Sequence, residues 1–299
     1  MDRNERFGMA DRVITIGFWV NAVLMVMKLL AGYFGDSEAV FADGIESASD
    51  FVAILSTIVA LKIGRMPFDA DHPYGHGKAE SISAILVSII IFAAGLGILY
   101  RASCTITTGK YLKPHLIAVM AAFVTILIKE SLYQITHRVS KKLESPAVDA
   151  IAKDHRKDAL TSIATLIGVG GAYFGFSFLD PLAAALTALF IFHIGWVTLR
   201  SAIRDLMDSQ VPGETLSAIT CIAEEVPGVE CVHEIRGRRS GQYMIIDLKL
   251  EMDPEMTVRQ SHEIATQVKR LIFIKISNVG DVMIHINPSR EIHEDLIRL

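Results

Sequence analysis

Long apolar runs separated by short polar loops fill the first two thirds of the chain. An α-helix needs roughly 20 residues to cross the ~30 Å hydrocarbon core of a bilayer. Six segments are long enough, and they cover residues 13–34, 40–62, 80–101, 112–135, 147–174 and 178–199. We therefore expect an α-helical membrane protein with six transmembrane helices.

The pattern changes at about residue 211, where ordinary soluble sequence begins. Its periodicity predicts a helix, two strands joined at Ser240-Gly241, a second helix and a third strand, over residues 211–226, 229–237, 242–252, 256–272 and 279–287. This α-β-β-α-β order suits a small sheet with helices on one face. We expect a transport domain over 1–210 and an α+β, ferredoxin-like domain over 211–299.

Positive charges set the expected orientation. Lysine and arginine gather before the first predicted span and in the loops after the second and fourth, although the loop after the third also holds two lysines. Short cytoplasmic loops carry an excess of these residues. Both termini are therefore expected in the cytoplasm. The first apolar run is too long for a signal peptide and reads as a retained helix.

Composition narrows the function. The chain is 51% hydrophobic with a net charge of -4, which indicates a lipid environment and no nucleic-acid partner. Its three cysteines lie far apart and read as unpaired thiols. No nucleophile-elbow or HExxH motif is present, so we do not expect an enzyme.

Two pairs of acids interrupt the apolar runs. Glu46 and Asp50 lie in the second predicted span, and Asp154 and Asp158 lie in the fifth. Residues four apart share a helix face, and at 1.5 Å per residue both pairs lie roughly 12–13 Å into the membrane, entered from opposite sides. The pairs could therefore meet and form an oxygen cage for one cation. Protons and a metal ion would then compete for the same oxygens.

Two alternatives stay open for these acids. Acidic residues inside a membrane usually mark an ion or proton pathway, but they also occur paired with lysines. The candidate partners are Lys28, Lys129, Lys153 and Lys157. The fifth helix could also begin later, which would leave its charges in water. Asp43 shares the face of Glu46 and Asp50 and could support them from outside the cage.

Three motifs resemble the cation diffusion facilitator family: ADGIESASD over residues 42–50, HPYGHGKAE over 72–80 and DHRKDA over 154–159. The resemblance runs from about residue 12 to 288. It implies a homodimeric six-helix transporter with a cytoplasmic metallochaperone-like domain, which exchanges a divalent metal ion for protons. The family's transport site takes one pair of ligands from each of two helices, here Glu46 with Asp50 and Asp154 with Asp158.

The residue types at the expected transport site indicate which metal ion it prefers. Zinc carriers of this family usually supply at least one histidine to the transport site, whereas here His155 stands one residue out of register with Asp154. An all-oxygen site favours a harder ion. Stretches 20–28, 206–208 and 236–238 also resemble the magnetosome branch of the family, which handles iron. We therefore expect Fe(II) first, then Mn(II) or Zn(II), in a bacterial cytoplasmic membrane or a derived organelle membrane such as the magnetosome.

Further candidate ligands lie outside the membrane. Asp69, His72 and His76, with Asp71 as an extra candidate, could hold a metal ion in the loop after the second span. The resemblance also implies a contact between Lys78 and Asp208.

The tail carries four more candidate ligands. The resemblance implies regulatory metal bound by His233, Asp247, His262 and His285. Lys249 and Asn287 stand where other family members have ligands, so a full zinc cluster is not expected. The alternative for the tail is solvated surface residues, and the alternative for the loop is a polar segment whose histidines cap or pack.

Two functions remain. The first is export of a divalent transition-metal cation from the cytoplasm in exchange for protons, by a homodimer or a heterodimer with a homologue. The second is a metal-sensing membrane scaffold that recruits partners without conducting ions. Charge inside the membrane favours the carrier, since a scaffold has no use for it.

Overall fold

The computed structural model describes residues 3–289, with side chains from residue 8 onward. Six long helices come first: α1 Arg3–Phe34, α2 Glu38–Gly64, α3 Ala79–Thr108, α4 Leu116–Leu143, α5 Pro146–Tyr173 and α6 Leu179–Leu206. All but α5 are long and apolar enough to cross a membrane. The helix α5 is also 28 residues long, and its charged first half sets it apart. The helical membrane region is thereby confirmed, with five candidate spans.

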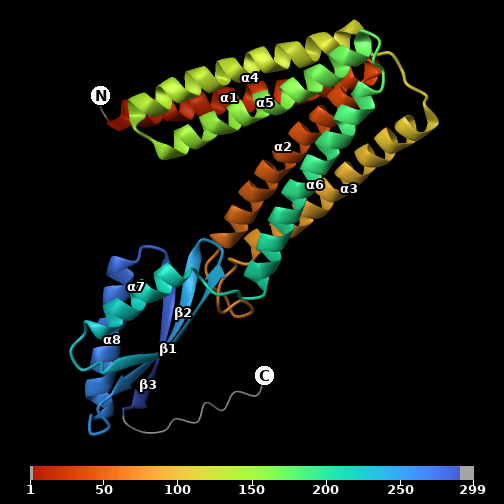
Figure 1. Ribbon diagram of the computed structural model, residues 1–299. Coiled ribbons are helices and arrows are strands. Elements are labelled where there is room, and N and C mark those ends of the chain that lie inside the picture. The colour runs from red at the N-terminus through yellow and green to blue at the C-terminus, as the bar shows by residue number, and fades with distance from the viewer. Residues whose placement is uncertain (1–2, 290–299) are drawn as a thin grey trace. The chain divides into compact units, whose positions relative to one another are not determined.

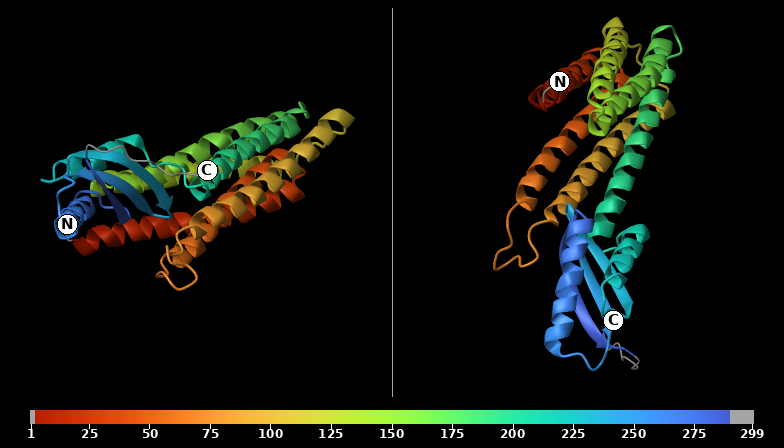
Figure 2. Two further views of the ribbon diagram at one scale, coloured as in Figure 1. Left: turned by 90° about the horizontal axis from the view of Figure 1, so that it is seen from below. Right: turned by 90° about the vertical axis from the view of Figure 1, so that its left-hand side faces the viewer.

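The six helices form two groups of three (Figures 1 and 2). In the first group α1, α4 and α5 run side by side, and in the second α2, α3 and α6 share a core of small and branched apolar residues. Ala118, Ala121 and Ala122 of α4 pack with Val40 of α2 and Val169 of α5. This small-residue cluster joins the two groups, because short side chains let helix backbones approach closely.

Two glycines mark the closest helix approaches. A Cβ atom on Gly32 of α1 would stand 2.4 Å from the backbone nitrogen of Phe41 in α2. One on Gly168 of α5 would stand 2.4 Å from the Cβ of Ala183 in α6. Only glycine fits at either contact, so these positions fix where one helix group meets the other.

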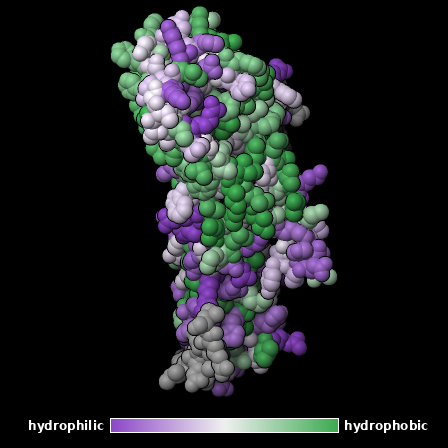
Figure 3. Space-filling model, turned by 90° about the vertical axis from the view of Figure 1, so that its right-hand side faces the viewer, coloured by the Kyte–Doolittle hydropathy of each residue, from purple (hydrophilic) through white to green (hydrophobic). Residues whose placement is uncertain are grey.

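Apolar side chains also cover the outside of the helices. Trp19 and Val23 of α1, Leu96 of α3, Phe123 of α4 and Trp196 of α6 are all more than half exposed. Figure 3 shows a band of hydrophobic residues over the helices on one face. Such continuous apolar surface is unfavourable in water and is suited to lipid.

Residues 213–288 contain α7 Gly213–Glu224, β1 Cys231–Ser240, β2 Tyr243–Met252, α8 Val258–Lys275 and β3 Val279–Pro288. The predicted α-β-β-α-β order is confirmed, with each boundary within three residues of its expected place. The sheet has the order β1-β2-β3, with β1 antiparallel and β3 parallel to β2. Both helices lie on one face of the sheet (Figure 1).

The alternation in β2 builds this domain's core. Ile246, Leu248, Leu250 and Met252 are at most 1% exposed, whereas the residues between them are half-buried. They pack against α7 and α8. Successive strand residues point to opposite faces, so the other face of the sheet stays open and presents Asp247.

By its internal contacts the chain divides into two compact units, one of residues 1–56 and 86–198 and the other of 57–85 and 199–299. The segment between α2 and α3 therefore belongs with the tail. Lys78 donates a hydrogen bond of 2.6 Å to Asp208 and another to the carbonyl of Asp205. The predicted contact between Lys78 and Asp208 is thus confirmed. Residues 290–299 of the predicted second domain lie outside the described residues.

Candidate metal centre

The acids of α2 lie in the first half of the helix, with Asp50 close to its midpoint. Glu46 is 8% exposed, and Asp50 follows one turn later with an exposed side chain. Ser162, one turn after Asp158 on α5, donates a hydrogen bond of 3.2 Å to Asp43 of α2, so these faces of α2 and α5 pack against each other. The face of α2 that carries Glu46 and Asp50 therefore packs on the face of α5 that carries Asp158.

The side chains of α5 that are buried differ from those that the spacing predicts. Asp158 is partly buried, with 27% of its side chain exposed, whereas Asp154 is exposed. The neighbouring His155 is 4% exposed and faces Gly17 of α1. Its Nε2 atom is buried and has no hydrogen-bond partner in the described part of the chain. The packed face of α5 thus presents His155 together with Asp158.

A buried ion pair lies beside Glu46. Lys28 of α1 is 1% exposed, and its Nζ donates to Asp43 Oδ1 at 2.9 Å and to Ser47 Oγ at 3.0 Å. Ser162 of α5 donates to the other oxygen of Asp43 at 3.2 Å. This network joins α1, α2 and α5 and neutralises Asp43, which therefore supports the site from outside.

A second ion pair lies within the site itself. Lys129 of α4 is 4% exposed, and its Nζ stands 2.6 Å from Asp158 Oδ2. Of the other two candidate lysines, Lys153 pairs with Asp149 at 2.8 Å and Lys157 lies over the ring of Phe190. The alternative of lysine pairing is therefore realised for Asp43 and Asp158.

Glu46 and Asp50 are not neutralised in this way. Within residues 8–289, neither carboxylate forms an ion pair with a lysine, arginine or histidine. Two carboxylates without an ion-pair partner offer oxygen ligands to a cation, and oxygen donors suit Mn(II) and Fe(II) better than softer ions. The arrangement can therefore attract one divalent cation, whereas the full cage with Asp154 stays a prediction.

The loop residues come together closely. Asp69, His72 and His76 each offer a ligand atom within 4.8 Å of the others, and in the described residues they form the only such group of three or more His, Cys, Asp or Glu. His72 Nδ1 lies 3.1 Å from Asp69 Oδ1, and His76 Nε2 lies 3.5 Å from Oδ2. The His72 backbone N–H and the nearby imidazoles lower the pKa of Asp69, so this carboxylate is ionised at neutral pH.

We expect the double substitution His72→Ala and His76→Ala to remove one bound metal ion per chain. Both imidazoles are lost, and a single carboxylate holds a divalent transition metal poorly. Equilibrium dialysis of the full-length protein against Zn(II), followed by elemental analysis, measures the number bound. His115→Ala, which removes an exposed histidine from another loop, serves as the control. Unchanged stoichiometry in the double variant would exclude a metal site here.

The tail candidates do not converge within one chain. Asp247 and His285 line the open face of the sheet, where Asp247 lies 3.6 Å from Arg238. His262 is exposed on α8, and α8 covers the opposite face. His233 stands at a bulge in β1 and pairs with Glu251 at 3.0 Å. A regulatory site built from these residues stays a prediction.

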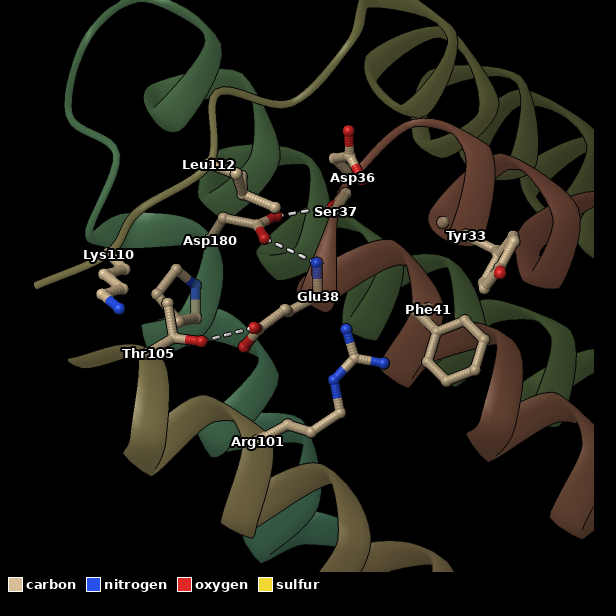
Figure 4. Close-up of a pocket in the computed structure, with 12 residues that line it drawn as sticks. Tyr33, Asp36, Ser37, Glu38, Phe41, Arg101, Thr105, Lys110, Leu112 and Asp180 are labelled. Atoms are coloured by element: carbon tan, nitrogen blue, oxygen red, sulfur yellow. Dashed lines mark hydrogen bonds between the residues drawn. The ribbon is translucent and has the colours of Figure 1, made fainter. Parts of the chain in front are cut away.

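One buried acid was missed by the sequence reasoning. Asp180, at the start of α6, accepts hydrogen bonds from Ser37 Oγ at 2.6 Å and from the backbone N–H groups of Glu38 at 2.6 Å and Ala39 at 3.4 Å. It lines a cavity of about 330 Å³ with Glu38 and Arg101 (Figure 4). The Asp-Pro step at 180–181 was a helix-start signal, but only the fold shows that Asp180 caps a different helix.

Comparison with known proteins agrees with this arrangement. Residues 14–207 match the cation efflux transmembrane domain, and residues 211–289 match the cytoplasmic domain of cation efflux proteins. The manganese efflux system protein MneP of Bacillus subtilis is 36% identical, with 95% of this chain and 98% of that protein covered.

Two further relatives come from other settings. Magnetosome protein MamM of Magnetospirillum gryphiswaldense is 35% identical, with 88% of this chain and 84% of that protein covered. Metal tolerance protein C1 of Arabidopsis thaliana is 34% identical over 93% of this chain, which spans 62% of that protein. Among solved structures, the nickel form of a single-residue variant of the MamM C-terminal domain is 34% identical, with a TM-score of 0.26 and coverage of 27% of this chain and all of that one. The chain is therefore a multi-pass membrane protein that belongs to the cation efflux family of metal transporters, the cation diffusion facilitators.

Proposed function

We propose that this protein exports a divalent transition-metal ion from the cytoplasm in exchange for protons. The single observation that carries the proposal is the pair Glu46 and Asp50 in α2, which has no ion-pair partner among residues 8–289 and lies on the helix face that packs on α5. Ionised groups in lipid are unfavourable without a partner. A divalent cation, or protons in its place, supplies that partner, and exchange between the two drives transport.

Export requires α5 to cross the membrane as the sixth helix. At 1.5 Å per residue its 28 residues reach about 42 Å, enough to span the bilayer. Ser145 caps its start and Pro146 occupies its first turn, so the helix begins before its charged residues and includes them. Six crossings leave both termini on one side, and the tail matches a domain described as cytoplasmic.

For the transported ion we propose Mn(II) or Fe(II) ahead of Zn(II). Glu46, Asp50 and Asp158 offer oxygen, which the harder ions prefer. The name of the Bacillus subtilis relative specifies manganese. The preference for Fe(II) that the sequence suggested stays a prediction, and the two ions are best compared directly.

We further propose a homodimer in which the tail responds to metal. Asp247 and His285 lie on an open sheet face, available to a second copy, and the four tail candidates are not gathered within one chain. The membrane is a bacterial cytoplasmic membrane or one derived from it, such as the magnetosome membrane.

Transport by proteoliposomes tests the proposal. With an imposed pH gradient we expect Mn(II) and Fe(II) flux in the wild type and at least a hundredfold less in the double variant Glu46→Gln and Asp50→Asn. Neutral amides keep the side-chain shape and remove the charge that attracts the cation.

The exposed acid Asp36 supplies the matched control. Asp36→Asn makes the same chemical change on the loop before α2, and we expect it to keep wild-type flux. Equal flux in the double variant and the wild type would reject the carrier and favour the scaffold.

A further inference from the structure

Lys129 places a positive charge near the middle of the membrane helices. It stands close to the midpoint of α4, Leu116–Leu143, roughly 20 Å from either end at 1.5 Å per residue. A lysine side chain is too short to reach the membrane surface from that depth. Its ammonium group must therefore find its partners inside the protein.

Asp158 is the partner that the structure shows. The Nζ–Oδ2 distance of 2.6 Å is that of a charge-assisted hydrogen bond. A metal ion that binds Asp158 carries the same sign of charge as the ammonium group. The two cations repel each other at this range, so Lys129 cannot hold Asp158 unchanged once the metal arrives.

A second buried polar group lies on the same face of α5 as Asp158. His155, one turn before Asp158 on α5, is buried, and no described residue forms a hydrogen bond with its Nε2 atom. Lys129 is hydrogen-bonded to Asp158, three residues further along the same face of α5, so its ammonium group lies beside the helix turn that carries His155. A buried polar atom without a partner is costly, and a hydrogen bond from Lys129 would satisfy it.

We propose that Lys129 is a built-in counter-cation of the transport site. It pairs with Asp158 when no metal is bound, and it turns toward His155 Nε2 when a divalent cation takes Asp158. This inference rests on the proposed function, because it assumes that metal binds at Glu46, Asp50 and Asp158. Two discrete arrangements of one side chain are the kind of element that couples binding to release.

The exchange has a consequence for affinity. Metal binding must break the Lys129–Asp158 pair, so the lysine weakens metal binding and speeds release. Removing the ammonium group leaves Asp158 without a counter-charge before metal arrives, which makes metal binding more favourable. Arginine in its place forms a forked pair with a carboxylate that is harder to displace. The two substitutions therefore act in opposite directions.

Calorimetric titration of Mn(II) into the full-length protein in lipid nanodiscs tests these opposite effects on metal affinity. The transport site is identified as the binding component that Asp50→Asn removes. For that component we expect Lys129→Met to bind at least fivefold tighter than the wild type and Lys129→Arg at least fivefold weaker. Lys141→Met removes an exposed lysine from the same helix and should leave the affinity unchanged.

The outcomes separate the two proposals. If Asp50→Asn removes no component, the proposed function fails. If it removes one, but Lys129→Met binds no tighter or Lys129→Arg no weaker, only the role of Lys129 is overturned. Should Lys129→Met fail to give a monodisperse protein, Lys129→Arg decides alone.

His155→Leu tests the second acceptor. It should weaken Mn(II) binding in the wild-type background, because the displaced lysine then lacks a partner. It should have no effect in Lys129→Met, and an equal effect in both backgrounds would contradict the exchange.

Discussion

Lys28→Met should destabilise the protein by about 3–5 kcal/mol, the usual cost of removing one member of a buried ion pair. The Lys28 side chain is 2% exposed and that of Asp43 4%, so the remaining carboxylate would be buried without its counter-charge. Ser47 would also lose its hydrogen bond from Lys28. The midpoint of thermal unfolding in detergent should fall by roughly 10 °C or more, as monitored by size-exclusion chromatography after heating.

A double variant separates the charge from the packing. Lys28→Met combined with Asp43→Leu replaces the ion pair by apolar side chains of similar volume, an exchange that is often neutral or stabilising. We expect it to recover most of the lost thermal stability. If the single variant already melts like the wild type, the pair contributes little and the network does not fix α1 against α2 and α5.

The tail was readable from the sequence because its signals are local. Alternation in β2, with Ile246 and Leu248 on one face and Asp247 on the other, gives both the element and its buried side. Gly241, with φ of 60°, takes the left-handed conformation that the hairpin turn requires. Thr257 and Gln260 form the capping box that begins α8. Each signal lies within a few residues of the structure that it predicts.

The transport site was harder to predict because the packing of neighbouring helices decides which face of a helix is buried. Asp154 and His155 are both close to Asp158 on the surface of α5, and spacing alone favours Asp154 at i, i+4. The structure buries His155 instead, where Gly17 of α1 leaves room for the ring. Nothing in the spacing of α5 reveals a glycine on another helix.

The partners of the acids show the same limit. Four lysines were candidates, and the sequence could not rank them. Burial separates them: Lys28 and Lys129 are enclosed and pair across helices, whereas Lys153 is largely exposed and pairs along its own helix. Whether a lysine pairs with an acid of the site therefore depends on which helix packs against it. Only the tertiary structure shows that packing.

Asp180→Ala is expected to destabilise the protein by about 3 kcal/mol or more. The alanine would leave three donors at the start of α2 without their acceptor: the Ser37 hydroxyl and the N–H groups of Glu38 and Ala39. Each buried unsatisfied donor costs about 1–3 kcal/mol, and the carboxylate also complements the positive end of the helix dipole. The midpoint of thermal unfolding in detergent should fall. The midpoint of Asp180→Asn should lie between those of the wild type and Asp180→Ala, because its amide keeps a single acceptor oxygen.

The location of Asp180 makes this substitution a test of the helix arrangement itself. Its carboxylate is the contact through which α6 holds the first turn of α2, beside the cavity that Glu38 and Arg101 line (Figure 4). Asp36→Asn alters an acid in the adjoining loop that is exposed and lies 3.9 Å from His115, so it should leave the midpoint within 1–2 °C of the wild type. A wild-type midpoint for Asp180→Ala would show that water replaces the carboxylate, and that α2 is held against α6 by its apolar contacts alone.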